Sequence, residues 1–313
     1  MKKALLCKGR FLAIFHKLKR YNLNSSGDIV GDFFIFSLLF IVVFSTIYPF
    51  WHVLMYSISD SQKSMSGGLF FTPRGFSLVG YRMLFRTSQI FVAYKNTIAK
   101  TVIGTILSII ISALTAYPLS LKRFRGRRFI GGMIFFTMLF SGGIIPTYLV
   151  IKDLRLLDTF WVYVIPGMMN AYNMFILRNY FVSIPPSLEE SAMLDGANPF
   201  QTLFKIILPL SKPALAAIAM FYGVLNWNSY MDGILYVNSQ KLQLLQVYLR
   251  QMIASAGAKG ALSVASSMTE AARLTEDTMK MVVIAVSVIP VLFVYPFLQK
   301  YYTKGALIGS VKG

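Results

Sequence analysis

Cysteine and acidic residues are scarce in this sequence. Among 313 residues there is one cysteine, Cys7, and there are 12 aspartates and glutamates against 31 lysines and arginines. A single cysteine excludes an internal disulfide. The two histidines, His16 and His52, are far apart, and no His/Cys/acid cluster has the spacing of a metal site. The sequence also has no Gly-x-x-x-x-Gly-Lys-Ser/Thr phosphate loop, so energy from a nucleotide has to come through another polypeptide.

Charge of either sign is low, whereas apolar residues are abundant. Charged residues make up 14% of the chain and hydrophobic residues 56%, compared with about 25% charged residues in soluble globular proteins. A helix of about 20 apolar residues crosses the hydrocarbon core of a membrane, and backbone groups in lipid must be satisfied within the segment. The sequence therefore predicts an all-α membrane protein with six transmembrane helices. The predicted spans are Phe33 to Tyr56, Thr97 to Leu121, Phe129 to Ile151, Thr159 to Phe181, Ile206 to Tyr230 and Met281 to Leu298.

The predicted spans hold no acidic residue in their central parts. Asp32, Asp60 and Asp232 lie only at span ends. Because ionisable residues inside a membrane usually mark proton or ion routes, their absence argues against an ion-coupled carrier. It argues equally against a membrane-embedded enzyme, since no carboxylate pair and no Ser/His/Asp set can be assembled.

Lysine and arginine indicate the orientation, because they are retained on the cytoplasmic side. Seven of them precede the first span, and five, Lys122, Arg123, Arg125, Arg127 and Arg128, follow the second. Both termini and the 186–209 loop are therefore predicted to be cytoplasmic. These flanks explain most of the net charge of +19, so we expect no binding of nucleic acid.

The loop between the fourth and fifth spans carries helix start and stop signals. Ser187 and Glu190 have the spacing of a capping box, which predicts a helix beginning near Leu188. Gly196 can end that helix, and Asn198 followed by Pro199 can start another. Two short helices joined by a tight turn are suited to docking into another protein.

The residues of this loop also carry a family resemblance. The matching positions are Glu190, Ser191 and Ala192, then Asp195, Gly196 and Ala197, then Ile206, Leu208 and Pro209. Their identity and spacing resemble the EAA loop of bacterial ABC importer permeases, with Ser191 where alanine is usual. Other segments are similar to the carbohydrate branch of that family, namely 77–81, 94–97, 116–119, 141–148 and 304–313. The chain thus resembles a binding-protein-dependent transport inner-membrane component of the smaller, maltose-importer permease type.

The resemblance implies a type I ABC importer permease fold in a bacterial cell membrane. It implies a second related permease, two copies of an ABC ATPase, and an extracellular solute-binding protein that delivers a carbohydrate, expected to be an oligosaccharide. It implies no catalytic residue, metal or cofactor on this chain, with ATP and Mg on the ATPase. The helix around Glu190 to Gly196 is then expected to lie in a groove of the ATPase.

Eight polar and aromatic residues in the fourth and fifth spans are the predicted substrate-pathway residues. Aromatic rings stack on sugar C–H faces, and amides bond sugar hydroxyls, although the same residue types also anchor spans and bridge helices. The eight residues are Asn170, Tyr172, Asn173, Tyr222, Asn226, Trp227, Asn228 and Tyr230.

The predicted organisation has three parts. A basic cytoplasmic segment, residues 1–32, precedes a six-helix domain, 33–303, with outer loops at 57–96 and 231–279, and a cytoplasmic tail, 304–313, follows. Three alternatives remain from the sequence alone: an ion-coupled secondary sugar carrier, an ABC permease for a solute other than sugar, and a membrane-embedded glycan-processing enzyme.

Overall fold

The protein is predominantly helical in the part of the chain that the structure describes. The structure, a computed structural model, describes residues 26–262 and 275–310, and outside its helices these ranges contain one isolated β-bridge, between Ser59 and Phe76. The elements in chain order are α2 (Ser26–Ser57), α3 (Ser61–Ser64), α4 (Val79–Phe85), α5 (Gln89–Ser120), α6 (Arg127–Leu139), α7 (Ile144–Asp153), η1 (Phe160–Tyr163), α8 (Ala171–Ser183), α9 (Pro186–Leu194), α10 (Pro199–Thr202), η2 (Leu203–Ile207), α11 (Leu208–Leu210), α12 (Lys212–Asn228), α13 (Met231–Tyr236), η3 (Gln240–Leu242), α14 (Leu245–Leu262) and α15 (Glu276–Ser310).

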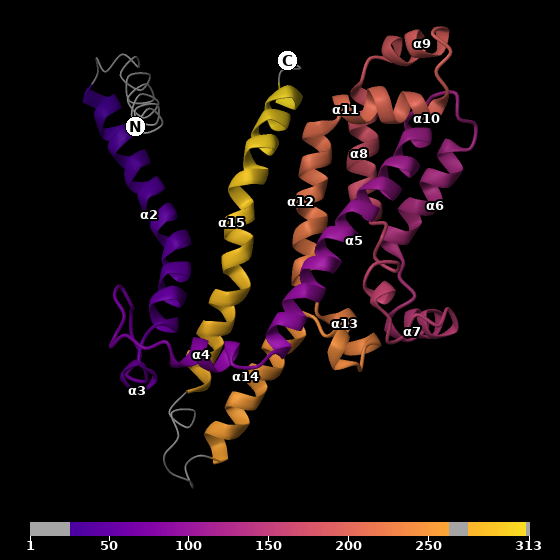
Figure 1. The fold of residues 1–313 in the computed structure, drawn as a ribbon. Helices are drawn as coiled ribbons and strands as arrows, with labels where there is room; N and C mark the ends of the chain where they lie inside the picture. The colour runs from indigo at the N-terminus through magenta and orange to yellow at the C-terminus, as the bar shows by residue number, and fades with distance from the viewer. Residues whose placement is uncertain (1–25, 263–274, 311–313) are drawn as a thin grey trace, which may run out of the picture.

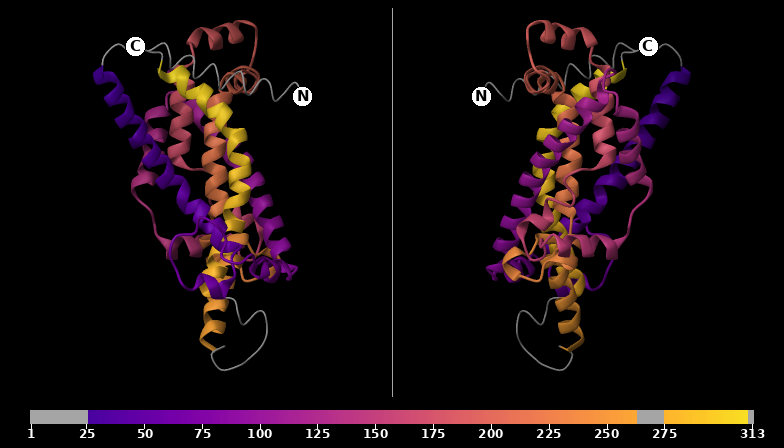
Figure 2. Two further views of the ribbon diagram at one scale, coloured as in Figure 1. Left: turned by 90° about the vertical axis from the view of Figure 1, so that its left-hand side faces the viewer. Right: turned by 90° about the vertical axis from the view of Figure 1, so that its right-hand side faces the viewer.

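The long helices lie side by side and give the molecule two distinct ends. Helix α5 packs against α12 and α8, α12 packs against α15, and α15 packs against α2. The start of α2, the end of α15 and the short helix α9 all lie at one end of this bundle, whereas α3, α7, α13 and α14 lie at the other (Figures 1 and 2). Three segments far apart in the sequence therefore share one end of the molecule.

Two helices in the described ranges are long and apolar enough to cross a membrane. They cover Gly31–Ser57 and Gln89–Ser120, and the most apolar stretches within them have mean hydropathies of 2.3 and 2.0. Two bent helix pairs would raise the number to four if each pair is one span. The most apolar stretch of α2 has none of its residues buried within the chain, so its sides are left for lipid or for another protein.

The predicted third and fourth spans are wrong as single helices. Helix α6 ends at Leu139, and α7 begins at Ile144 at an angle of 119°, because the chain turns through Gly143, which has φ 89°. In the predicted fourth span, Thr159 to Phe181, only η1 and the 13-residue α8 are helical. At 1.5 Å per residue α8 is about 20 Å long, shorter than a hydrocarbon core of about 30 Å.

The predicted fifth span is also wrong as a single straight helix. The chain between Ile206 and Tyr230 begins in η2 and α11, bends by 84° at Ser211, and continues as α12 only to Asn228. The predicted outer segments 57–96 and 231–279 contain α3, α4, α13, η3 and α14, and each also includes the first residues of the long helix that follows it, since α5 begins at residue 89 and α15 at residue 276.

The other three predicted spans coincide with continuous helices. The predicted first and sixth spans lie within α2 and α15, and the second lies within α5 except for its last residue. Helix α15 continues to Ser310, so residues 304–310 of the predicted tail belong to this helix. Residues 1–25 and 311–313 of the predicted terminal segments lie outside the described residues.

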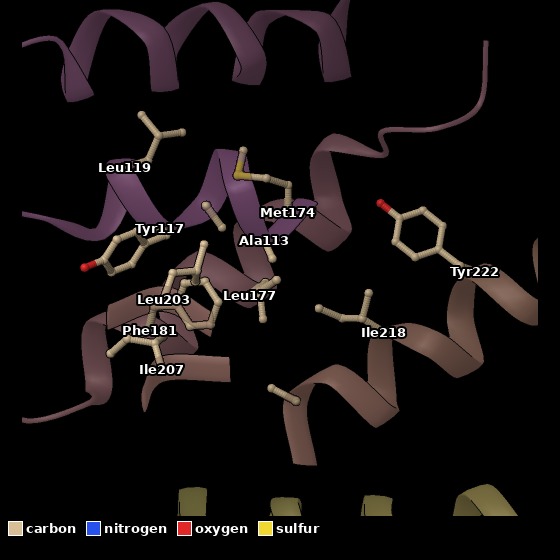
Figure 3. Close-up of a cluster of buried hydrophobic side chains, with 12 residues drawn as sticks. Ala113, Tyr117, Leu119, Met174, Leu177, Phe181, Leu203, Ile207, Ile218 and Tyr222 are labelled. Carbon is tan, nitrogen blue, oxygen red and sulfur yellow. The ribbon is translucent and has the colours of Figure 1, made fainter. Parts of the chain in front are cut away.

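One apolar cluster joins the bundle to the segment around α9. Ala113 and Tyr117 of α5, Met174, Leu177 and Phe181 of α8, Leu203 and Ile207 of η2, and Ile218 and Tyr222 of α12 are buried in it (Figure 3). Burying apolar side chains of this size stabilises the fold by about 1.5–3 kcal/mol each. The segment after α9 is thereby fixed to three long helices.

Candidate functional site

Helix α9 has a well-defined end but a different start from the predicted one. It begins at Pro186 with Pro185 before it and no side-chain cap, so the predicted Ser187–Glu190 capping box is absent. At its other end Gly196 has φ 79°, its N–H donates to the Met193 carbonyl, and the Ala197 N–H donates to the Ala192 carbonyl. This pair of bonds is the Schellman arrangement, which confirms Gly196 as the residue that ends the helix.

The next helix starts where the sequence predicted it. The Asn198 side chain accepts from the Gln201 N–H at 2.9 Å, and Gln201 Oε1 accepts from the Asn198 N–H at 3.0 Å. This is a capping box. Helix α10 then passes directly into η2, a π-helical segment, a form often found at functional sites.

A charged contact holds α9 against the end of α5. Glu189 Oε1 accepts from Arg123 Nη2 at 2.6 Å and from the Tyr117 hydroxyl at 3.2 Å. Tyr117 belongs to α5, and Arg123 to the turn that follows it. Both partners of Glu189 lie far from it in the sequence, so sequence reasoning missed this contact and emphasised Glu190, which is exposed and lies next to it.

Helix α9 is the outermost helix at its end of the molecule (Figure 1), and α9 and the segment after it expose large apolar side chains. Leu194 is 89% exposed, although it lies in a polar helix end, and Phe200 is 66% exposed. Phe204 and Leu188 are also exposed. Large apolar side chains exposed on such a projecting segment are candidates for a protein interface, and none of these four was predicted.

The predicted loop residues divide into exposed positions and anchoring positions. Glu190, Ser191, Asp195, Gly196 and Pro209 are exposed, Ala197 and Ile206 are half-buried, Ala192 is buried, and Leu208 packs against the apolar cluster. The motif therefore supplies both the outer surface of the loop and the contacts that fix it to the bundle.

A second site is a cavity between α5, α8, α12 and α15. Its volume is about 610 Å³, and its wall includes Asn170, Tyr172, Asn173 and Trp227 of the predicted substrate-pathway residues, together with Thr101. Almost all of the exposed wall is apolar or aromatic, and none of the lining side chains is charged. A cavity of this kind can stack a sugar ring and bond a few of its hydroxyls.

Four predicted pathway residues do not line this cavity. The buried Tyr222 hydroxyl accepts from the Asn170 N–H at 3.0 Å, and Asn226 packs on α5 at Gly104 and contacts Thr105. Asn228 bonds its own helix, and the Tyr230 ring lies under Arg250. These four residues hold helices or loops in place in the structure.

A buried ion pair at the opposite end of the molecule was not predicted. Lys100 of α5, 1% exposed, lies 2.9 Å from the Asp232 carboxylate at the start of α13. Asp232 also accepts from the Ser229 hydroxyl at 2.7 Å. The Lys100 ammonium lies 5.2 Å from the centre of the Tyr163 ring, whose hydroxyl donates to the Leu242 carbonyl. The sequence does not reveal this pair, because Asp232 lies 132 residues after Lys100.

The short helices around this ion pair are tied together by further bonds. Asp158 Oδ1 accepts from the N–H groups of Asn238 and Ser239 at 2.6 and 2.9 Å. The Tyr236 ring stacks on Tyr148 of α7. Burial and the nearby Asp232 carboxylate raise the pKa of the Tyr236 hydroxyl. In the described ranges no three His, Cys, Asp or Glu residues lie together as a metal site requires.

Comparison with known proteins gives consistent matches. The family model described as "Binding-protein-dependent transport system inner membrane component" matches residues 90–307. The polygalacturonan/rhamnogalacturonan transport system permease protein YtcP of Bacillus subtilis (strain 168) is 46% identical, over 90% of this chain and 98% of that protein. An arabinooligosaccharides transport system permease protein, AraQ of Halalkalibacterium halodurans, is 23% identical over 87% of this chain and 93% of that protein.

A solved structure resembles the whole fold. It is a chain of a bacterial ABC transporter involved in the import of the acidic polysaccharide alginate. The match has a TM-score of 0.78 and 35% sequence identity, and it covers 90% of this chain and 99% of that one.

Proposed function

Because the chain belongs to the family of binding-protein-dependent transport system inner membrane components, we propose that it is one permease subunit of an ATP-driven importer of carbohydrate. It is the transport subunit, and ATP with Mg is bound and hydrolysed by a separate ATPase. A second related permease completes the path, and an extracellular solute-binding protein delivers the cargo. The complex lies in the bacterial plasma membrane.

The observation that carries this proposal is the position of α9 and α10. Helix α9 is the outermost helix at its end of the bundle and is fixed to the end of α5 through Glu189, and the two helices expose Leu194 and Phe200. A projecting helix with exposed apolar side chains, fixed by an ion pair and a hydrogen bond to the end of a long helix, is suited to transmitting motion from a docked ATPase to the spans. The chain has no phosphate loop of its own, which is consistent with a separate ATPase.

The proposed topology has six spans, with both termini and α9 in the cytoplasm. The start of α2, the end of α15 and α9 share one end of the molecule, and five lysines and arginines follow α5 at that same end. This agreement between geometry and charge supports the orientation. The third and fifth crossings then use bent helix pairs, and the fourth uses η1 together with α8.

For the cargo we propose an oligosaccharide. YtcP and AraQ are named for transport of pectic polysaccharides and arabinooligosaccharides, and the solved structure belongs to an alginate importer. The cavity of about 610 Å³ has room for more than one sugar ring and has aromatic walls. We propose that Asn170, Tyr172, Asn173 and Trp227 face the cargo.

Replacing Tyr172 with alanine is expected to slow ATP-driven uptake about fivefold, because an aromatic contact contributes about 0.5–1.5 kcal/mol. Tyr172 is 59% exposed, so the loss of its ring should leave the fold intact. Phe76→Ala is the matched control, since Phe76 is 70% exposed and does not line the cavity. Uptake of labelled oligosaccharide into proteoliposomes containing the whole complex measures both. Equal slowing by the two variants would show that the cavity does not contact the transported sugar.

The test of the proposed function is purification of the chain from mild detergent with identification of all bound proteins. Recovery of a second permease and of an ATPase with a phosphate loop is expected. Recovery of the chain alone, still moving solute after reconstitution, would contradict the proposal and favour an ion-coupled carrier.

A further inference from the structure

A second large cavity lies at the α9 end of the molecule. Its wall is much more polar than that of the cavity between α5, α8, α12 and α15. Its volume is about 480 Å³, and it lies between the turn that joins α5 to α6 and the ends of α8 and α9. Nearly half of its exposed wall is polar. The charged residues of the wall are Lys122, Arg123, Arg127, Arg128, Arg178, Glu189 and Glu190.

Most of the positive charge in this cavity has no acidic partner. Arg123 is paired with Glu189 at 2.6 Å. Lys122, Arg127 and Arg128 make no ion pair within the described ranges. Five cations therefore face two carboxylates, and only one of the five is matched at contact distance. Such a site attracts an anion.

Arg178 makes the strongest case for an anion, because it lies within α8 rather than in a turn. It is five residues before the end of that helix, about 7.5 Å along its axis. Its Nε donates to the Leu119 carbonyl at 2.9 Å, and Nη1 makes a long contact of 3.4 Å with Asn179. No carboxylate within the described ranges pairs with it. Within these ranges its charge is met by a carbonyl and an amide oxygen but by no carboxylate, so a bound anion would be its only partner of opposite charge.

Apolar side chains lie beside the cations. Val182, one turn after Arg178, lines the same cavity and is 53% exposed. Phe129 and Ile130 follow Arg128 directly in the sequence and are also exposed. An anionic lipid has a negative headgroup and apolar chains. The cations of the cavity match the headgroup, and the exposed apolar side chains match the acyl chains, at the proposed cytoplasmic side of the membrane.

We propose that this cavity binds the phosphate of an anionic phospholipid of the inner leaflet, with Arg178 and the cations of the α5–α6 turn around the headgroup. The proposal rests on the proposed orientation of the chain. A soluble phosphate shares the headgroup chemistry, but the exposed apolar residues beside the cavity favour the lipid. The bound headgroup bridges the α5–α6 turn to α8, next to the base of α9.

Native mass spectrometry of the purified complex tests this directly, with phosphatidylglycerol and phosphatidylcholine added in equal amounts. The unchanged protein is expected to retain phosphatidylglycerol preferentially. Lys122→Gln with Arg128→Gln should weaken that preference about fivefold for each charge removed. Both side chains are exposed and bind no other group in the described structure, so this variant should fold. Arg178→Gln should weaken it as well.

The matched control is Lys152→Gln with Lys241→Gln, which removes two exposed cations in α7 and η3, near the other end of the molecule. An equal loss of lipid preference in both double variants, or none in either, would overturn the site. If inorganic phosphate displaces the retained lipid at millimolar concentration, the ligand is a soluble anion and the lipid assignment is wrong. Copurification of the ATPase in the same samples reports on the proposed function separately.

Discussion

Leu194→Glu is expected to detach the ATPase and to lower ATP-driven uptake at least thirtyfold. Leu194 is 89% exposed at the end of α9, so it contributes almost nothing to the packing of this chain. If it inserts into an apolar groove of the ATPase, a carboxylate there costs about 2 kcal/mol or more, as at other interface hot spots. Copurification of the ATPase and uptake by the reconstituted complex both report the loss.

Leu154→Glu is the control for this change. Leu154 is 61% exposed and directly follows α7, at the opposite end of the molecule. The same chemical change there should leave the ATPase bound. Both variants should accumulate in the membrane to the level of the unchanged protein. An ATPase that stays bound to the Leu194 variant at full strength would show that α9 is not the docking element.

Asp232→Asn is expected to destabilise the chain by about 3 kcal/mol, as breaking buried ion pairs generally does. The change leaves the Lys100 ammonium, 1% exposed, without an anion. Lys100→Met should cost less, because the Asp232 side chain is 41% exposed and water can hydrate its carboxylate. The thermal midpoint of the purified protein in detergent measures both.

The double variant Lys100→Met with Asp232→Asn separates the ion pair from simple loss of packing. Removing both charges together leaves no buried charge unpaired, so the double variant should be more stable than Asp232→Asn alone. Effects that add up would show that the two residues do not interact in the folded protein, and the pair would then have no part in holding α5 to α13.

Local signals in the sequence were sufficient for the ends of the short helices. Gly196 takes a left-handed conformation, and Asn198 caps the next helix, because both effects depend on residues within one helical turn. The capping box at Ser187 failed for a related reason: Pro186 can occupy the first helical turn without cost, so the helix starts earlier and Ser187 already lies within it.

Hydrophobicity located the apolar segments but not their breaks. A run such as Phe129 to Ile151 is apolar enough to span, yet Gly143 adopts φ 89° and the helix turns through 119°. Gly142, Gly143 and Pro146 are visible in the sequence as residues that permit distortion. Whether the chain bends there depends on packing against other helices, which one sequence does not contain.

Contacts over long distances in the sequence were beyond prediction. Lys100 with Asp232 and Arg123 with Glu189 each join residues more than 60 positions apart. Neither pair has a spacing that distinguishes it from the other charges of the chain. The sequence also did not show which of the eight pathway residues line the cavity and which hold helices in place, because Asn and Tyr can do either.

Two helical segments, Pro199–Leu210 and α12, meet at Ser211 at an angle of 84° and act together as a lever. The arm Pro199–Leu210 has 12 residues and is therefore about 18 Å long. It stands nearly at right angles to α12, so a displacement of its far end produces a torque on α12 rather than a push along it. By the geometry of an arm of that length, turning α12 by 10° about the bend carries the far end by about 3 Å. A small tilt of one span and a movement of atomic size at α10 are thus the same motion.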